Sequence, residues 1–117
     1  LKNPHQKAID YLNKNATKDI KLYANNDNGS YYVFDGYHPY MDGRVEVFVK
    51  ANNHKEDIML EYYNMSFGIL DVEKFLDKYK FTHLVVNRNE MLYNYLKNNK
   101  NYQKVVTVDE TYLYIRK

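Results

Sequence analysis

The sequence predicts a single α/β domain of the α+β kind, with a mixed sheet of about five to six strands packed against about four helices. Three observations favour this fold. Four stretches carry apolar residues at helical spacing, and strand-length apolar runs lie between them. The last two strand-like runs are joined by only Asp109-Glu110, which implies a terminal antiparallel hairpin. The 117 residues suit one core, and no repeat or low-complexity linker divides them, so residues 1–117 are expected to form one soluble domain.

The first elements are predicted from capping and periodicity. Asn3 and Pro4 are typical of an N-cap and a first helical position, and apolar residues at helical spacing continue this helix to about Asn15. Alternation of apolar and polar residues predicts a short strand within residues 18–24. A turn-rich run follows, and a second strand is expected over residues 30–34.

The middle of the chain combines a strand with two helices. After a short extended piece at residues 40–41, residues 44–50 alternate valines with other side chains and predict a strand. Residues 53–65 have a polar start followed by a broad apolar face, which predicts a helix. Asp71 is the expected N-cap of another helix over residues 71–79, whose apolar residues share one face.

The last third of the chain contains the most apolar short run. Residues 81–87 contain the continuous apolar run Leu84-Val85-Val86 between two predicted helices, and they predict a buried central strand. A helix is expected over residues 90–98. Residues 102–108 and 111–116 predict two strands of a hairpin at the edge of the sheet.

Composition excludes several classes of function. Seventeen basic and fifteen acidic side chains are interleaved, and the three arginines are far apart in the sequence, so we expect no nucleic-acid partner. The absence of cysteine excludes disulfides, thiolate catalysis and sulfur-ligated metals. The fourteen tyrosines fit the codon bias of an AT-rich bacterial genome, and the alternative is a tyrosine-rich surface that binds sugars or peptides.

Candidate binding residues are concentrated between residues 35 and 46. They are Asp35, His38, Tyr40, Asp42, Arg44 and Glu46. Their carboxylates, imidazole and guanidinium could form an acid/base pair or a site for a divalent metal. The structural alternative is that both Asp-Gly pairs form turns, and that Arg44 pairs with Asp42 or Glu46.

Other catalytic patterns are missing from the sequence. The four histidines are widely spaced and predict no zinc site; His5 is expected to be solvated and His83 to be a half-buried packing residue. Neither serine lies in a nucleophile turn, and the glycines form no phosphate-binding loop. We therefore expect no catalytic residue, no metal and no nucleotide cofactor.

Several short motifs follow one another along the chain. They are Asn3-Pro4-His5-Gln6, Gly29-Ser30-Tyr31, Tyr40-Met41-Asp42-Gly43-Arg44 leading to Glu46-Val47-Phe48, Phe75-Leu76-Asp77-Lys78-Tyr79 before Thr82-His83-Leu84-Val85-Val86, and Asp109-Glu110. Their order resembles the C-terminal segment of large bacterial membrane proteins. Those proteins are similar to membrane glycosyltransferases of the protein-mannosyltransferase-like type, which use lipid-linked sugars.

The resemblance implies an extracytoplasmic domain that follows the last transmembrane helix of a membrane glycosyltransferase. The catalytic acid of such an enzyme is expected in the membrane part, so no catalytic residue is transferred to this chain. The chain starts at Leu1 without an initiator methionine, and we expect it to be a fragment of a larger membrane protein.

The leading hypothesis is a non-catalytic accessory domain at the outer face of the cell membrane. It would pack on the transmembrane portion of the same polypeptide or engage a glycan or lipid-linked sugar acceptor. One alternative is a small metal-dependent hydrolase or transferase that uses Asp35, Asp42, Arg44 and Glu46. Another is a protein-interaction module, which requires an exposed patch of Tyr and Phe.

Overall fold

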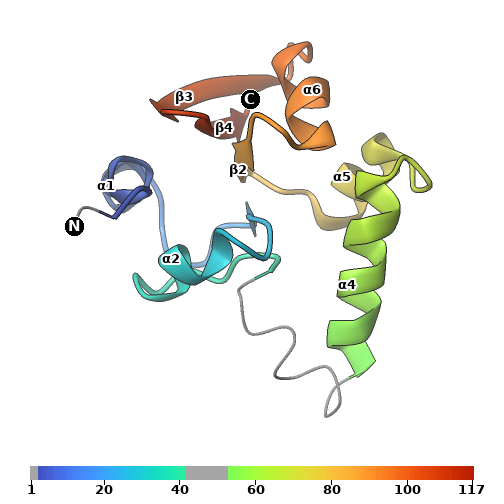
Figure 1. Cartoon of the computed structure of the whole chain (residues 1–117). Coiled ribbons are helices and arrows are strands. Elements are labelled where there is room, and N and C mark those ends of the chain that lie inside the picture. The colour runs from blue at the N-terminus through green and yellow to red at the C-terminus, as the bar shows by residue number, and fades with distance from the viewer. Residues whose placement is uncertain (1–2, 42–52) are drawn as a thin grey trace.

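A computed structural model describes residues 3–41 and 53–117 (Figure 1). This part of the chain has an α+β fold in which five helices accompany a mixed four-stranded sheet. The elements are α1 (Gln6–Asn15), β1 (Leu22–Tyr23), α2 (Gly29–Val33), α4 (Asn53–Ser66), α5 (Val72–Tyr79), β2 (His83–Asn87), α6 (Met91–Lys97), β3 (Tyr102–Val108) and β4 (Thr111–Arg116).

The sheet has the strand order β1-β2-β4-β3. β1 pairs with β2 in parallel, and β4 pairs antiparallel with both β2 and β3. Leu84, Val85 and Val86 of β2 are fully buried, because strands flank β2 on both sides and helices cover both faces. The predicted central strand and the predicted terminal hairpin are therefore confirmed.

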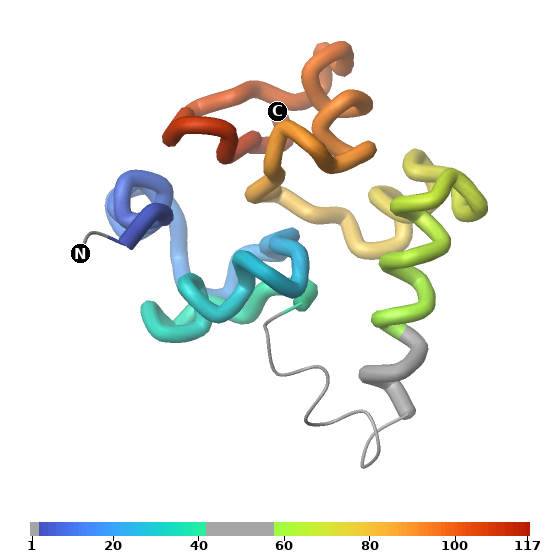
Figure 2. The backbone as a smooth tube through the Cα atoms, in the orientation of Figure 1, coloured from blue at the N-terminus to red at the C-terminus, as the bar shows by residue number. Residues whose placement is uncertain are grey.

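Two clusters of buried side chains lie on opposite faces of the sheet. Along β4, Tyr112 and Tyr114 belong to one cluster and Leu113 to the other, because successive side chains of a strand alternate between faces. The first cluster includes residues of α4, α5 and α6, and the second includes residues of α1 and α2. In Figure 2 the blue tube of α1 and the green and yellow tube of α4 and α5 accordingly lie on different sides of the molecule.

The prediction of a strand over residues 30–34 is wrong, because residues 30–33 belong to helix α2 and Phe34 is its C-cap. A strand would place Tyr32 and Phe34 on the same face, but Tyr32 is fully buried and Phe34 is 91% exposed. The hydroxyl of Tyr32 lies 2.8 Å from His5 Nδ1, a contact across the two helices that local strand propensity does not reveal. Tertiary packing therefore overrides the β-propensity of this run.

The other predicted elements agree with the structure where it describes them. The first helix, however, starts two residues later than predicted, with His5 as its N-cap and Gln6 as its first residue. Asn3 and Pro4 precede it, and Asn3 Oδ1 accepts a hydrogen bond from the His5 amide at 2.8 Å. Asp71 caps α5 and accepts a hydrogen bond from the Glu73 amide at 2.8 Å. The strand predicted over residues 44–50 lies outside the described residues. Within residues 3–41 and 53–117, no helix combines the length and the apolar character that a membrane crossing requires.

Candidate functional site

A cavity of about 540 Å³ opens between β1, α4, α5 and the segment that follows α2. Its volume lies in the range of small-molecule sites, about 300–1,000 Å³. Aromatic and aliphatic side chains line it together with charged ones, and we call it the tyrosine cavity. The lining residues are Asp19, Ile20, Lys21, Leu22, His38, Tyr40, Ile58, Lys78, Tyr79 and Phe81.

Backbone contacts bring the lining segments together. The Tyr40 amide donates a hydrogen bond to the Leu22 carbonyl at 2.9 Å, so the chain after α2 runs beside β1. Pro39 forms a parallel bridge with Leu22 in the same place. After α5, Lys80 adopts a left-handed conformation with φ of 54°, which turns the chain toward β2 and places Phe81 at the cavity.

Aromatic rings form one wall of the tyrosine cavity. Tyr79 and Phe81 stack with ring centroids 5.3 Å apart, and the Tyr40 ring stands edge-on to both at 5.1 and 5.7 Å. Phe75, fully buried, supports Tyr40 from the core at 5.3 Å in the same edge-to-face manner. These offset and edge-to-face arrangements are the favoured ones, so the wall is held rigidly.

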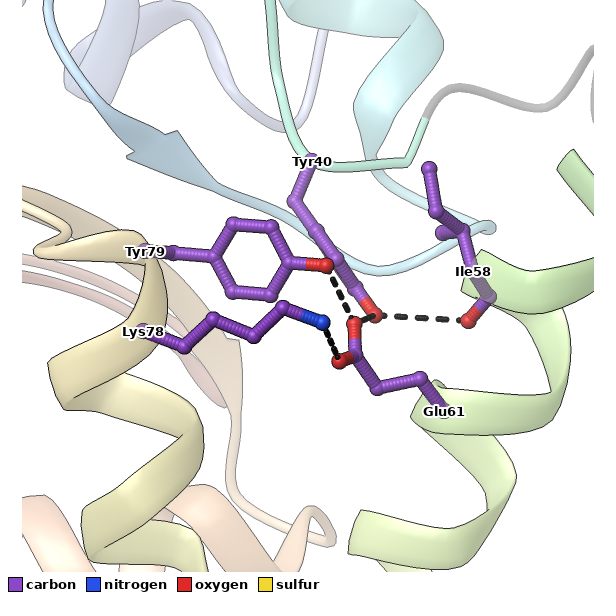
Figure 3. A network of polar contacts seen from close by, with 5 residues as sticks. All are labelled: Tyr40, Ile58, Glu61, Lys78 and Tyr79. Atoms are coloured by element: carbon purple, nitrogen blue, oxygen red, sulfur yellow. Dashed lines mark hydrogen bonds and ion pairs between the residues drawn. The ribbon is translucent and has the colours of Figure 1, made fainter. Parts of the chain in front are cut away.

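Glu61 of α4 joins the polar ends of Tyr40, Tyr79 and Lys78 through hydrogen bonds (Figure 3). Its Oε1 accepts hydrogen bonds from the Tyr40 hydroxyl at 2.7 Å and the Tyr79 hydroxyl at 2.5 Å. Its Oε2 accepts a hydrogen bond from Lys78 Nζ at 2.7 Å, an ion pair in which the Glu61 side chain is only 14% exposed. The Tyr40 hydroxyl also lies 3.3 Å from the Ile58 carbonyl oxygen.

The protonation states of this network follow from its contacts. Burial acts to raise the pKa of Glu61, but hydrogen bonds from Lys78, Tyr79 and Tyr40 outweigh it and the pKa is lowered. Burial and the contact with Glu61 raise the pKa of both Tyr40 and Tyr79, and the same carboxylate raises the pKa of Lys78. At neutral pH the network therefore consists of one carboxylate, two neutral phenols and one ammonium group.

The structure brings together two of the residues selected from the sequence. His38 and Tyr40 both line the tyrosine cavity. Asp35 is not among the lining residues; it lies in the turn after α2, where its amide donates a hydrogen bond to the Tyr32 carbonyl at 3.1 Å. The remaining three, Asp42, Arg44 and Glu46, lie outside the described residues, so the acid/base or metal cluster that they suggest stays a prediction.

Several residues of the site could not be recognised as site residues from the sequence. Glu61, Lys78 and Tyr79 come from two helices that are distant from Tyr40 in the chain, and no local motif links them. One signal was present, because Glu61 interrupts the apolar face that Ile58, Tyr62 and Met65 define at helical spacing. A carboxylate on such a face requires hydrogen-bond donors from elsewhere in the fold.

A second buried carboxyl group lies where the parallel strands β1 and β2 end. Glu90 Oε1 accepts a hydrogen bond from the Tyr23 hydroxyl at 2.9 Å, and Oε2 accepts one from the Asn87 amide at 2.7 Å. Burial raises the pKa of Glu90 and outweighs these hydrogen bonds. This carboxyl group joins the turn before α6 to β1.

His5 is buried, contrary to the expectation from sequence. It is 4% exposed and its ring stacks on Tyr31 with centroids 4.7 Å apart. The expectation is wrong because the start of α1 packs against α2, a segment whose sequence pattern predicts a strand. Burial lowers the pKa of His5. His83 is half-buried, as expected.

Neither a cluster of metal ligands nor a similar protein indicates what the site binds. In the part of the chain that the structure describes, no three His, Asp or Glu side chains are grouped so that they could hold a metal ion. Comparisons with family models, curated proteins and solved structures found no match to this chain. Functional inference therefore starts from the geometry of the tyrosine cavity.

Proposed function

We propose that this chain is a non-catalytic extracytoplasmic domain of a polytopic membrane protein, and that its tyrosine cavity binds a saccharide unit of a glycan or lipid-linked acceptor. The membrane attachment rests on the resemblance of the ordered motifs to membrane glycosyltransferases. The assignment of a saccharide as the ligand rests on the chemistry of the cavity, which is independent of that resemblance.

The observation that carries the proposal is an aromatic wall beside charged side chains in one cavity. Sugar rings have apolar C–H faces, which pack on the rings of Tyr40 and Tyr79, themselves held against the buried ring of Phe81. Sugars also have hydroxyl groups, which need hydrogen-bond partners. The exposed side chains of Asp19 and Lys21 line the same cavity and offer such partners. A ligand with both kinds of surface fits this lining better than a purely apolar or purely ionic one.

Glu61 acts here as a positioning residue. It is not one of the lining residues, but it fixes the hydroxyls of Tyr40 and Tyr79 from behind. Because both hydroxyls are fixed, the two rings lose little freedom when a ligand binds. The carboxylate thus favours binding by holding the aromatic wall in place in advance.

The protonation of Glu61 supports binding rather than hydrolysis. Glycoside hydrolysis generally needs one carboxyl group that is protonated and donates its proton to the leaving group. Hydrogen bonds from three side chains outweigh the effect of burial and lower the pKa of Glu61, so it stays ionised at neutral pH. It is therefore poorly suited to the role of general acid.

Calorimetric titration of the chain with a panel of neutral, acidic and N-acetylated oligosaccharides tests this function. We expect at least one sugar to bind, the Tyr79→Ala variant to lose that binding, and the exposed-surface variant Lys7→Ala to keep it. The same mixtures are checked for released sugar, and none is expected. Failure of every sugar to bind, or turnover by the isolated chain, would contradict the proposal.

The membrane attachment has its own test in the coding sequence upstream of Leu1. The proposal expects several apolar stretches there, each of about 20 residues and thus long enough to cross a bilayer. An upstream sequence without such stretches would contradict the membrane attachment and leave the saccharide site to be judged by its titrations.

A further inference from the structure

The segment from Met91 to Val108 contains three lysines and no acidic residue, so all fifteen acidic residues of the chain lie outside it. It spans α6, the turn that follows, and the edge strand β3, which lie together at one end of the molecule (Figure 1). In a chain whose charges are otherwise interleaved, this segment is a local concentration of positive charge.

The fold gathers two of these lysines around a stacked pair of tyrosines. Tyr93 of α6 and Tyr112 of β4 stack with centroids 4.8 Å apart and planes 13° from parallel. Lys97 Nζ lies 5.3 Å from the Tyr93 ring centroid, and Lys104 Nζ lies 5.1 Å from that of Tyr112. Arg88 adds a third cation, because its Nη2 donates a hydrogen bond to the Tyr112 hydroxyl at 2.8 Å.

The positive charge of this surface is only partly neutralised. Glu110 is an acidic partner of Arg88, with Oε1 3.7 Å from Arg88 Nη1, and both side chains are mostly exposed. Within the described residues, neither Lys97 nor Lys104 forms an ion pair with a carboxylate. Both are exposed, as is Lys100 in the turn between them. We define the basic face as Arg88, Lys97, Lys100 and Lys104.

We infer that the basic face docks on the anionic headgroups of a lipid bilayer. Its cations come from a loop, a helix, a turn and an edge strand, so they form an extended surface of the kind that matches a layer of headgroups. The ammonium groups of Lys97 and Lys104 lie over tyrosine rings on exposed side chains, and such pairs of aromatic rings and cations suit a membrane interface. The inference rests on the proposed attachment to a membrane protein, since that attachment keeps the domain near a bilayer.

Co-sedimentation with vesicles tests the docking surface. The chain is mixed with vesicles of phosphatidylcholine alone or of phosphatidylcholine with phosphatidylglycerol, at low and high salt. We expect binding only to the anionic vesicles, and its loss at high salt. The triple variant Lys97→Glu, Lys100→Glu, Lys104→Glu is expected to bind at least about tenfold more weakly.

A charge-matched control distinguishes the effect of the basic face on vesicle binding from the effect of net charge. The variant Lys7→Glu, Lys14→Glu, Lys74→Glu makes the same change in net charge on exposed positions of α1 and α5, and it is expected to bind nearly as the unmodified chain does. A third variant with glutamine at positions 97, 100 and 104 is expected to bind at an intermediate level. It keeps the result interpretable if charge reversal disturbs folding, which circular dichroism monitors.

Three outcomes would overturn the inference. These are absence of binding to anionic vesicles, equal loss in the two charge-reversed variants, and binding to an acidic polysaccharide such as alginate in place of vesicles. The saccharide titration described above is repeated on the basic-face variant, where sugar binding should be unchanged. Sugar binding without vesicle binding defeats only the docking surface, and vesicle binding without sugar binding defeats only the saccharide site.

Discussion

The hydroxyls of Tyr40 and Tyr79 converge on a single oxygen atom, Glu61 Oε1, at 2.7 and 2.5 Å. Tyr40 follows α2 and Tyr79 ends α5, so this contact joins segments from both halves of the chain to helix α4. The carboxylate is therefore a structural tie of the fold and a support of the tyrosine cavity.

Replacement of Glu61 by glutamine should destabilise the protein by about 1–3 kcal/mol. The amide oxygen is a weaker acceptor for the two phenols, and the ion pair with Lys78 is lost. Urea unfolding at neutral pH measures the change. Glu110→Gln is the control, since Glu110 is 75% exposed and its loss should change stability by less than about 0.5 kcal/mol. Equal effects of the two substitutions would contradict the structural role of Glu61.

His5 should make the protein less stable as the pH falls. Burial lowers the pKa of His5 in the folded state below its ordinary value of about 6.5, so the unfolded state binds the proton more readily. Stability is therefore full above pH of about 6.5 and decreases as the pH falls toward the folded-state pKa. Thermal unfolding of the chain and of His5→Gln measures this. The variant, which keeps an acceptor near Tyr32 but cannot be protonated, should have a flatter profile over that range. The same decrease in both proteins would contradict the role of His5.

Ionisation of Glu90 should give protein stability the opposite pH dependence. Its pKa is raised by burial, so ionisation costs more in the folded than in the unfolded state. The protein should lose part of its stability as the pH rises from about 4.3, the ordinary pKa of a glutamate, through the raised folded-state value. Glu90→Gln should lack this loss. Urea unfolding at a series of pH values compares the free energy of unfolding of the two proteins. If it changes with pH in the same way in both, ionisation of Glu90 does not destabilise the folded state.

Asp71→Ala should destabilise the protein by about 1 kcal/mol, because Asp71 caps α5 through the Glu73 amide. Asp77→Ala provides the control, since Asp77 is exposed in the last turn of the same helix and makes no cap. Urea unfolding distinguishes the two variants. An Asp71 variant as stable as the Asp77 variant would show that the cap does not stabilise α5.

Periodicity and caps predicted those elements of the described chain whose structure is determined locally. The central strand, the capped helix after Asp71 and the terminal hairpin follow from short-range patterns. Helix α2 was missed because its conformation depends on burying Tyr32 against α1, a contact between residues 27 positions apart. The same limit applied to the site, since Tyr40 and Glu61 are 21 positions apart and meet only through the packing of α4.

Nuclear Overhauser effects between a bound saccharide and the aromatic rings test the central claim most directly. A sugar that binds in the calorimetric panel is added to the chain, and contacts are measured from its C–H protons to aromatic ring protons. We predict contacts to Tyr40 and Tyr79, and their loss in the Tyr79→Ala variant. Sugar contacts to other tyrosines, with none to these two rings, would contradict the saccharide site.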